Sequence, residues 1–158
     1  MADGYRAMSK SMTLRAGTCY DTDIVAWADQ QAALLRAGEF SQLDIEHIAD
    51  EVEDAGKSEQ RAIASRMVVL LGHLLKRQVQ PERRGKSWQG TIREQRKAIA
   101  LHLEDVPSLK TKLRDQRWLA VIWADAKAAA YQETSLEDFP DDCPWTIQAI
   151  LDGRFLPD

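Results

Sequence analysis

The chain has 158 residues, a length typical of one globular domain. Hydrophobic residues make up 44% of it and charged residues 29%, with only 8 glycines and 5 prolines, so the composition excludes a loop-rich or disordered chain. The formal net charge of −4 argues against a protein whose whole surface binds nucleic acid or an anionic membrane.

Cysteine usage and hydropathy indicate the compartment. Cys19 and Cys143 are far apart and lack the spacing of a zinc site or a disulfide framework. No apolar run is long enough to span a membrane, and the first residues lack the apolar centre of a signal peptide. We therefore expect a soluble, cytoplasmic protein with no membrane partner. It should have a mobile tail over residues 1–19 and a single helical domain over residues 20–158.

The first predicted helix begins at Asp21, a residue type that caps helix N-termini, and ends at Gly38. Apolar residues recur between them at spacings of three and four, which predicts one buried face. A long second helix is expected to begin at Ser41. This serine stands three residues before Asp44, in an acidic variant of the capping box.

The apolar stripe of the long second helix has a gap at residues 56–60. A glycine inside a helix costs about 1 kcal/mol relative to alanine, so Gly56 predicts a kink or a break in this gap. Pro81 has no backbone N–H and restricts the residue before it, which predicts the end of the helix.

The second half of the chain predicts three further helices separated by proline-containing turns. They are expected from Ser87 to Val106, from Pro107 or Ser108 through Tyr131, and from Pro144 to Gly153. No segment of strand length alternates apolar and polar residues, so no strand is predicted. The pattern predicts an all-α fold, an antiparallel helical bundle of about four main helices plus a short C-terminal helix.

Several motifs follow one another along nearly the whole chain. They are YDxDxxAWxxxQxxLLRxGxF from Tyr20 to Phe40, LDxxxIxxEVE from Leu43 to Glu53, LLxHLLK from Leu70 to Lys76, QPERR from Gln80 to Arg84, SWxxTIxEQRxxI from Ser87 to Ile99, and ETxLxxFPxxCP from Glu133 to Pro144. In this order they resemble a bacterial family, domain of unknown function family 29. The resemblance implies a helical, soluble bacterial protein, and it supplies no activity.

An acidic stretch at residues 39–59 contains eight acidic residues and one basic residue. Within it, Asp44, His47 and Glu51 have helical spacings of three and four, so their side chains share a face and can bind a divalent metal. A di-metal bundle needs Glu-x-x-His units on two helices, and only one degenerate copy occurs here. The favoured interpretation is a solvated helical face, with the metal site as the alternative.

His73 lies in the most apolar part of the chain, beside Leu70 and Leu74. We expect it to be a core or boundary residue with one hydrogen bond. The alternative is a metal ligand, added to the three candidates above, or a general base in a buried polar site.

A basic stretch at residues 76–97 contains eight basic and two acidic residues, interleaved with a tryptophan and glutamines. This composition is typical of surfaces that bind phosphates and stack on bases. We favour pairing of the basic stretch with the acidic stretch, within the chain or between subunits, because the chain as a whole is not basic. A further tryptophan lies off the apolar stripe of its helix and can mark a partner surface. The candidate interaction or nucleic-acid residues are Arg83, Arg84, Lys86, Trp88, Arg93 and Trp118.

The sequence contains no glycine-rich phosphate loop, GxSxG elbow or HExxH motif. No cofactor is evident either. We therefore predict a non-enzymatic protein-interaction or regulatory module that binds a protein partner or associates with itself. One alternative is a metal-binding bundle or metal-dependent enzyme. The other is a nucleic-acid-associated protein that uses residues 76–97, which the net charge does not favour.

Overall fold

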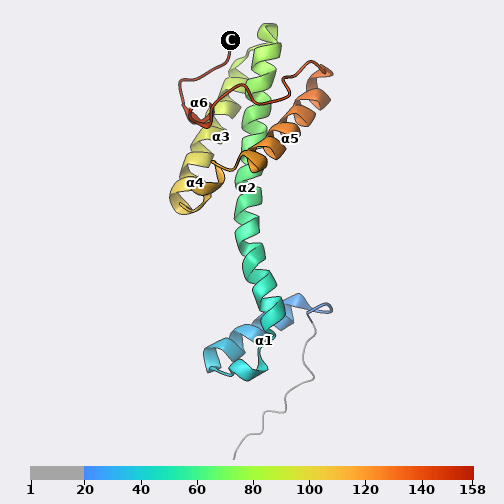
Figure 1. Ribbon diagram of the computed structural model, residues 1–158, viewed down its shortest axis with the longest axis vertical. Coiled ribbons are helices and arrows are strands. Elements are labelled where there is room, and N and C mark those ends of the chain that lie inside the picture. Colours follow the sequence, from blue (N-terminus) through green and yellow to red (C-terminus); the bar gives the residue numbers. More distant parts are fainter. Residues whose placement is uncertain (1–19) are drawn as a thin grey trace, which may run out of the picture. The chain divides into compact units, whose positions relative to one another are not determined.

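The computed structural model describes residues 20–158, and the tail expected over residues 1–19 lies outside the described residues. The described part is helical and contains no strand, which confirms the predicted fold class (Figure 1). Its helices are α1 Ile24–Ala37, η1 Phe40–Gln42, α2 Ile45–Val79, η2 Pro81–Arg83, α3 Lys86–Asp105, α4 Leu109–Lys112, α5 Gln116–Thr134 and α6 Ile147–Leu151, where η marks a 3₁₀-helix. Over residues 20–158, none of these helices has the length and apolarity that a bilayer crossing requires.

The chain divides into two compact units, one up to Asp54 and the other from Ala55 to Asp158. We call the described part of the first, residues 20–54, the N-terminal unit, and the second the C-terminal unit. Helix α2 contributes its beginning to one and the rest to the other. A single domain over residues 20–158 stays a prediction.

Helix α1 has a strong signal at each end. The side chain of Asp23 caps its N-terminus, because Oδ1 accepts a hydrogen bond of 3.0 Å from the backbone N–H of Ala26. The cap is therefore two residues later than the predicted Asp21. Gly38 ends the helix with φ +75°, a left-handed conformation that favours glycine, and this prediction is confirmed.

Helix α2 is continuous over its 35 residues, which contradicts a break at Gly56, whereas a kink there stays a prediction. Each added helical residue also adds a backbone hydrogen bond, and one glycine penalty does not outweigh this cooperativity. The helix begins at Ile45, because Ser41 is part of η1 and Asp44 occupies the capping position. It ends at Val79, shortly before Pro81, as predicted.

Capping residues also decide the later boundaries. The single helix expected to open at Pro107 or Ser108 is instead two helices, α4 and α5. Asp115 separates them, since its Oδ1 accepts a hydrogen bond of 3.1 Å from Trp118 N and so starts α5. Helix α3 begins at Lys86, and its cap position, Gly85, lies two residues before the predicted cap Ser87. Helix α6 is shorter than predicted.

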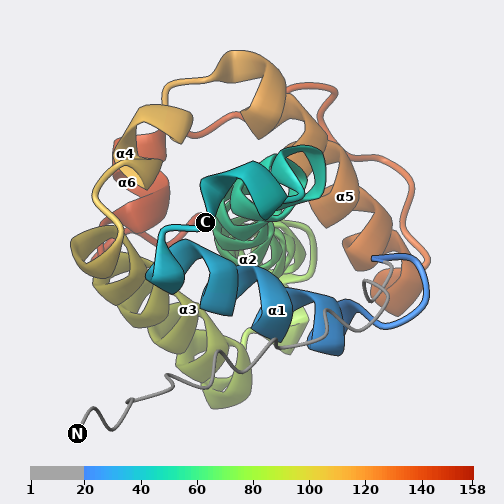
Figure 2. The same ribbon diagram turned by 90° about the horizontal axis from the view of Figure 1, so that it is seen from below.

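The hydrophobic core of the C-terminal unit lies where α3 and α5 flank the second half of α2 (Figures 1 and 2). Helices α2 and α5 lie close together at Gly72, since a Cβ at this position would be in ordinary van der Waals contact, at 3.6 Å, with the backbone oxygen of Ala126. The fully buried large apolar residues of α2 follow helical spacing. The core includes Ile63, Met67, Leu70, Leu74, Leu75, Ile92, Ile99, Ile122, Trp123 and Ala126.

We expect Leu70→Ala to lower the free energy of unfolding by about 2–5 kcal/mol, because Leu70 is fully buried and its truncation leaves a cavity. The matched control is Val69→Ala at the preceding position of α2, where the side chain is 39% exposed and the expected change is about 0.5 kcal/mol. Urea unfolding followed by circular dichroism measures both. Equal small effects would contradict the observed register of α2.

Candidate functional site

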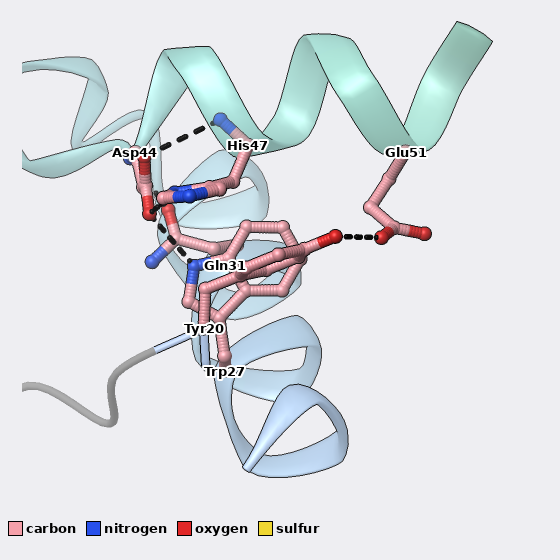
Figure 3. Close-up of polar contacts among 6 residues, drawn as sticks. All are labelled: Tyr20, Trp27, Gln31, Asp44, His47 and Glu51. Atoms are coloured by element: carbon pink, nitrogen blue, oxygen red, sulfur yellow. Dashed lines mark hydrogen bonds and ion pairs between the residues drawn. The ribbon is translucent and has the colours of Figure 1, made fainter. Parts of the chain in front are cut away.

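A cluster of polar and aromatic side chains joins α1 to the start of α2 inside the N-terminal unit (Figure 3). Trp27 and Gln31 are one helical turn apart and are the buried residues of α1. They face a row of three side chains at spacings of three and four, together with Tyr20, which precedes α1. The three residues of the row are Asp44, His47 and Glu51.

Asp44 is the centre of the cluster. Its Oδ2 accepts hydrogen bonds from Trp27 Nε1 at 3.0 Å and from the ring Nδ1 of His47 at 2.7 Å. Its backbone N–H donates to Gln31 Oε1 at 2.9 Å, and its carbonyl accepts from Ile48 N, which makes it the N-cap of α2. Asp44 therefore starts α2 and holds α1 against it through both its backbone and its side chain.

Tyr20 covers the other side of His47. The two rings are stacked, with centroids 4.1 Å apart and planes 18° from parallel. Trp27 meets Tyr20 edge to face at 4.9 Å. The Tyr20 hydroxyl donates a hydrogen bond of 2.6 Å to Glu51 Oε1. The imidazole of His47 thus stacks on an aromatic ring and is hydrogen-bonded to a carboxylate.

The hydrogen bonds of the cluster shift three pKa values. The hydrogen bond to His47 lowers the pKa of Asp44, and the reciprocal bond raises the pKa of His47. The hydrogen bond to Glu51 raises the pKa of Tyr20 to about 12, so this hydroxyl keeps its proton at neutral pH. Asp44 and protonated His47 form an ion pair whose members are each about one-third exposed.

The structure brings together part of the predicted metal set. Asp44 and His47 are hydrogen-bonded to each other, and Glu51 is bound to the Tyr20 hydroxyl rather than directed to them. His73 belongs to the C-terminal unit. Within residues 20–158, no group of three or more His, Cys, Asp or Glu side chains is arranged to hold a metal ion.

His73 has a local backbone partner. Its Nδ1 lies 2.9 Å from the carbonyl oxygen of Val69, one turn earlier on α2. Burial lowers the pKa of His73, which favours a neutral imidazole that donates to this carbonyl. The geometry agrees with a boundary residue that has one hydrogen bond.

The candidate residues of the basic stretch lie in different environments. Arg83, Lys86 and Arg93 are exposed. Arg84 is half-buried, and its Nε donates a hydrogen bond of 2.9 Å to the carbonyl of Arg77 at the end of α2. Arg84 therefore supports the fold, and three cations of the candidate set are free to meet solvent or a partner.

The two tryptophans of the candidate set are half-buried. Trp88 lies beneath the ammonium of Lys76, whose Nζ is 5.3 Å from the ring centroid. Trp118 packs against the hydrophobic core. Neither tryptophan is a freely projecting ring, so both contribute more to packing than their sequence positions indicate.

The sequence prediction missed a buried lysine. Lys76 is only 2% exposed, and its Nζ donates to Glu133 Oε2 from α5. The burial of Lys76 could have been expected from its position directly after Leu74 and Leu75, because this segment of α2 is buried on several faces. Arg96 on α3 was also missed as a core residue, with 7% exposure.

Charge pairing between the acidic and basic stretches stays a prediction. Glu59 of the acidic stretch pairs with His102 on α3, with an oxygen-to-nitrogen distance of 2.7 Å. Lys76 of the basic stretch pairs with Glu133. These residues therefore have partners outside the two stretches.

We expect Asp44→Asn to lower the pKa of His47 toward its ordinary value of 6.5, because the variant removes the carboxylate that favours imidazolium. NMR titration of the His47 ring protons measures this shift. The matched control is Glu46→Gln, which removes a negative charge from an exposed residue directly before His47. Equal shifts in both variants would show that the hydrogen bond is not the cause.

The same linkage fixes a pH window. Because the pKa of Asp44 is lowered on folding, Asp44 stabilises the folded state above about pH 3.8, and this stabilisation is lost as the pH falls through the pKa of the folded state. Because the pKa of His47 is raised on folding, His47 stabilises the folded state below about pH 6.5, and this stabilisation is lost as the pH rises through the pKa of the folded state. The pair is therefore expected to contribute most between these two values.

We expect Glu133→Gln to lower the free energy of unfolding by about 1–3 kcal/mol, since it leaves the buried ammonium of Lys76 without a counter-charge. Lys76→Met should change stability by less than about 1 kcal/mol, because it removes the charge and leaves Glu133, 59% exposed, in water. Urea unfolding compares the two, with exposed Glu137→Gln as control. A larger loss from Lys76→Met than from Glu133→Gln would contradict this account.

The pattern of one family, described as Domain of unknown function DUF29, matches residues 19–156. Comparisons with curated proteins and with solved structures find no match. The family assignment confirms the resemblance seen in the motifs and covers nearly the whole chain. The chain belongs to the DUF29 family of domains of unknown function.

Proposed function

We propose that this protein is a protein-interaction module that associates with a second copy of itself. In this association the N-terminal unit of one copy binds the surface around the exposed cations Arg83 and Lys86 of the other copy. The observation that carries the proposal is the apolar surface of the N-terminal unit. Within 35 residues, six large apolar side chains are 45–69% exposed. They are Ile24, Val25, Leu35, Phe40, Ile45 and Val52.

The N-terminal unit has little core of its own. On α1 only Trp27 and Gln31 are buried, and no residue of α2 up to Asp54 is buried. Exposed apolar side chains beside so few buried ones therefore favour burial against a partner.

Charge favours a second copy as that partner. Residues 20–54 contain ten acidic residues against Arg36 alone, a formal charge of −9. The same chain exposes cations at the start of α3 and just before it, where a matching acidic surface can bind. These exposed cations are Arg83 and Lys86. Apolar contacts surrounded by opposite charges have the composition of a specific protein interface.

We expect the purified chain to self-associate. Its mass in solution should rise with protein concentration at low salt and should be smaller at moderate salt. Phe40→Ser combined with Val52→Ser, at positions 65% and 69% exposed, should abolish association without disturbing the fold. Val121→Ser on α5, 58% exposed, is the matched control and should leave the mass unchanged. Light scattering after gel filtration measures all three, and circular dichroism checks the fold.

A charge-reversal variant tests whether exposed cations contribute to self-association. Arg83→Glu with Lys86→Glu reverses two exposed cations and avoids Arg84, which holds the end of α2. Exposed charges are screened over a Debye length of about 8 Å at physiological salt, so this variant should remove most of the salt dependence. A chain that stays monomeric at every concentration and salt would overturn the proposal.

Nucleic-acid binding is the alternative that the exposed cations support. Its weakness is the aromatic component, because Trp88 is half-buried against Lys76 and offers little ring for stacking. A mobility-shift assay with single-stranded DNA at low salt, repeated with the Arg83→Glu and Lys86→Glu variant, separates this alternative from self-association. A shift that the variant abolishes would favour it.

A further inference from the structure

A cavity of about 430 Å³ lies between α3 and the C-terminal segment, inside the C-terminal unit. Four polar side chains at spacings of three and four give it one wall, since they share a face of α3. They are Gln89, Arg93, Arg96 and Lys97. Ile92 and Leu156 add apolar surface. Among the described residues, the lining contains three cations and no carboxylate.

Arg96 is the buried member of this wall. Its side chain is 7% exposed, and its Nε donates a hydrogen bond of 2.7 Å to the carbonyl oxygen of Ile150. Its Nη2 is buried and has no hydrogen-bond partner within the described part of the chain. A buried donor without a partner is costly, and Arg96 is one of the residues that line the cavity, so a group bound there can supply the partner.

Asp152 is the carboxylate whose charge acts on Arg96. It raises the pKa of the guanidinium, and burial lowers that pKa by a larger amount. The Asp152 carboxylate is engaged locally, since its Oδ1 accepts a hydrogen bond of 2.9 Å from Arg154 N. It does not line the cavity and leaves the three cations there without a counter-ion from the lining.

We propose that this cavity binds the oxyanion group, a phosphate or a carboxylate, of a small organic molecule with a short apolar part. The fork of a guanidinium matches two oxygens of such a group, and the exposed Arg93 and Lys97 add charge at the rim. Ile92 and Leu156 face the apolar part. The volume lies within the range of small-molecule sites. This site is independent of the proposed self-association, which uses the N-terminal unit and Arg83 and Lys86.

Isothermal titration calorimetry of the full chain tests the site with inorganic phosphate, phenyl phosphate and benzoate, each at matched ionic strength in chloride. We expect saturable binding at one site per chain. Phenyl phosphate should bind about threefold or more tightly than inorganic phosphate, because its ring adds apolar burial. Benzoate reports whether a carboxylate replaces the phosphate group. No saturable binding of any of the three above the chloride control would overturn the proposal.

Variants locate the binding. Arg93→Gln and Lys97→Gln are exposed changes that should each weaken binding about tenfold, the effect of one charge-assisted hydrogen bond. Lys86→Gln, on the same helix and outside the cavity, is the matched control and should change affinity less than about twofold. Arg96→Gln should abolish binding, with circular dichroism as a check because Arg96 also holds Ile150. Equal weakening by Arg93→Gln and Lys86→Gln would mean unspecific charge attraction and would reject the site.

Discussion

The continuous backbone hydrogen bonding of α2 is the constraint on which the rest of the structure depends. One helix of 35 residues supplies its first turns to the N-terminal unit and its remainder to the C-terminal unit. Different interactions stabilise the two parts of the helix. From Ile63 onward the helix buries apolar side chains at helical spacing, whereas its first turns bury none and are held through Asp44. Burial of apolar area is non-directional and strong, and hydrogen bonds at a partly exposed carboxylate are directional and individually modest.

This difference leaves apolar side chains on the surface of the N-terminal unit. Asp44 fixes the geometry of α1 against α2 by accepting from Trp27 and His47 and by capping the helix. The geometry is specified with little apolar burial, so residues such as Phe40 and Val52 remain on the surface. A unit whose shape is set by polar contacts can present apolar side chains to a partner without an extensive core beneath them.

The basic stretch is divided by the fold into cations that serve the interior and cations that face outward. Lys76 is enclosed by Glu133 and the Trp88 ring, and Arg96 is anchored to the carbonyl of Ile150. Neither is available to a large surface partner. The exposed positions that remain include Arg83 and Lys86. A charge count over residues 76–97 therefore overstates the basic surface, because Lys76 and Arg96 are buried.

The sequence by itself determined the all-α fold, the end of α1 at Gly38 and the end of α2 before Pro81, because periodicity, left-handed glycine and proline act within a few residues. It also placed Asp44, His47 and Glu51 on one face of a helix, which the cluster confirms. Only the tertiary structure decided what these side chains bind. Tyr20 and Trp27 reach them from another element, and Lys76 meets Glu133 across 57 positions of sequence. Such partners are set by how helices pack, which local spacing does not encode.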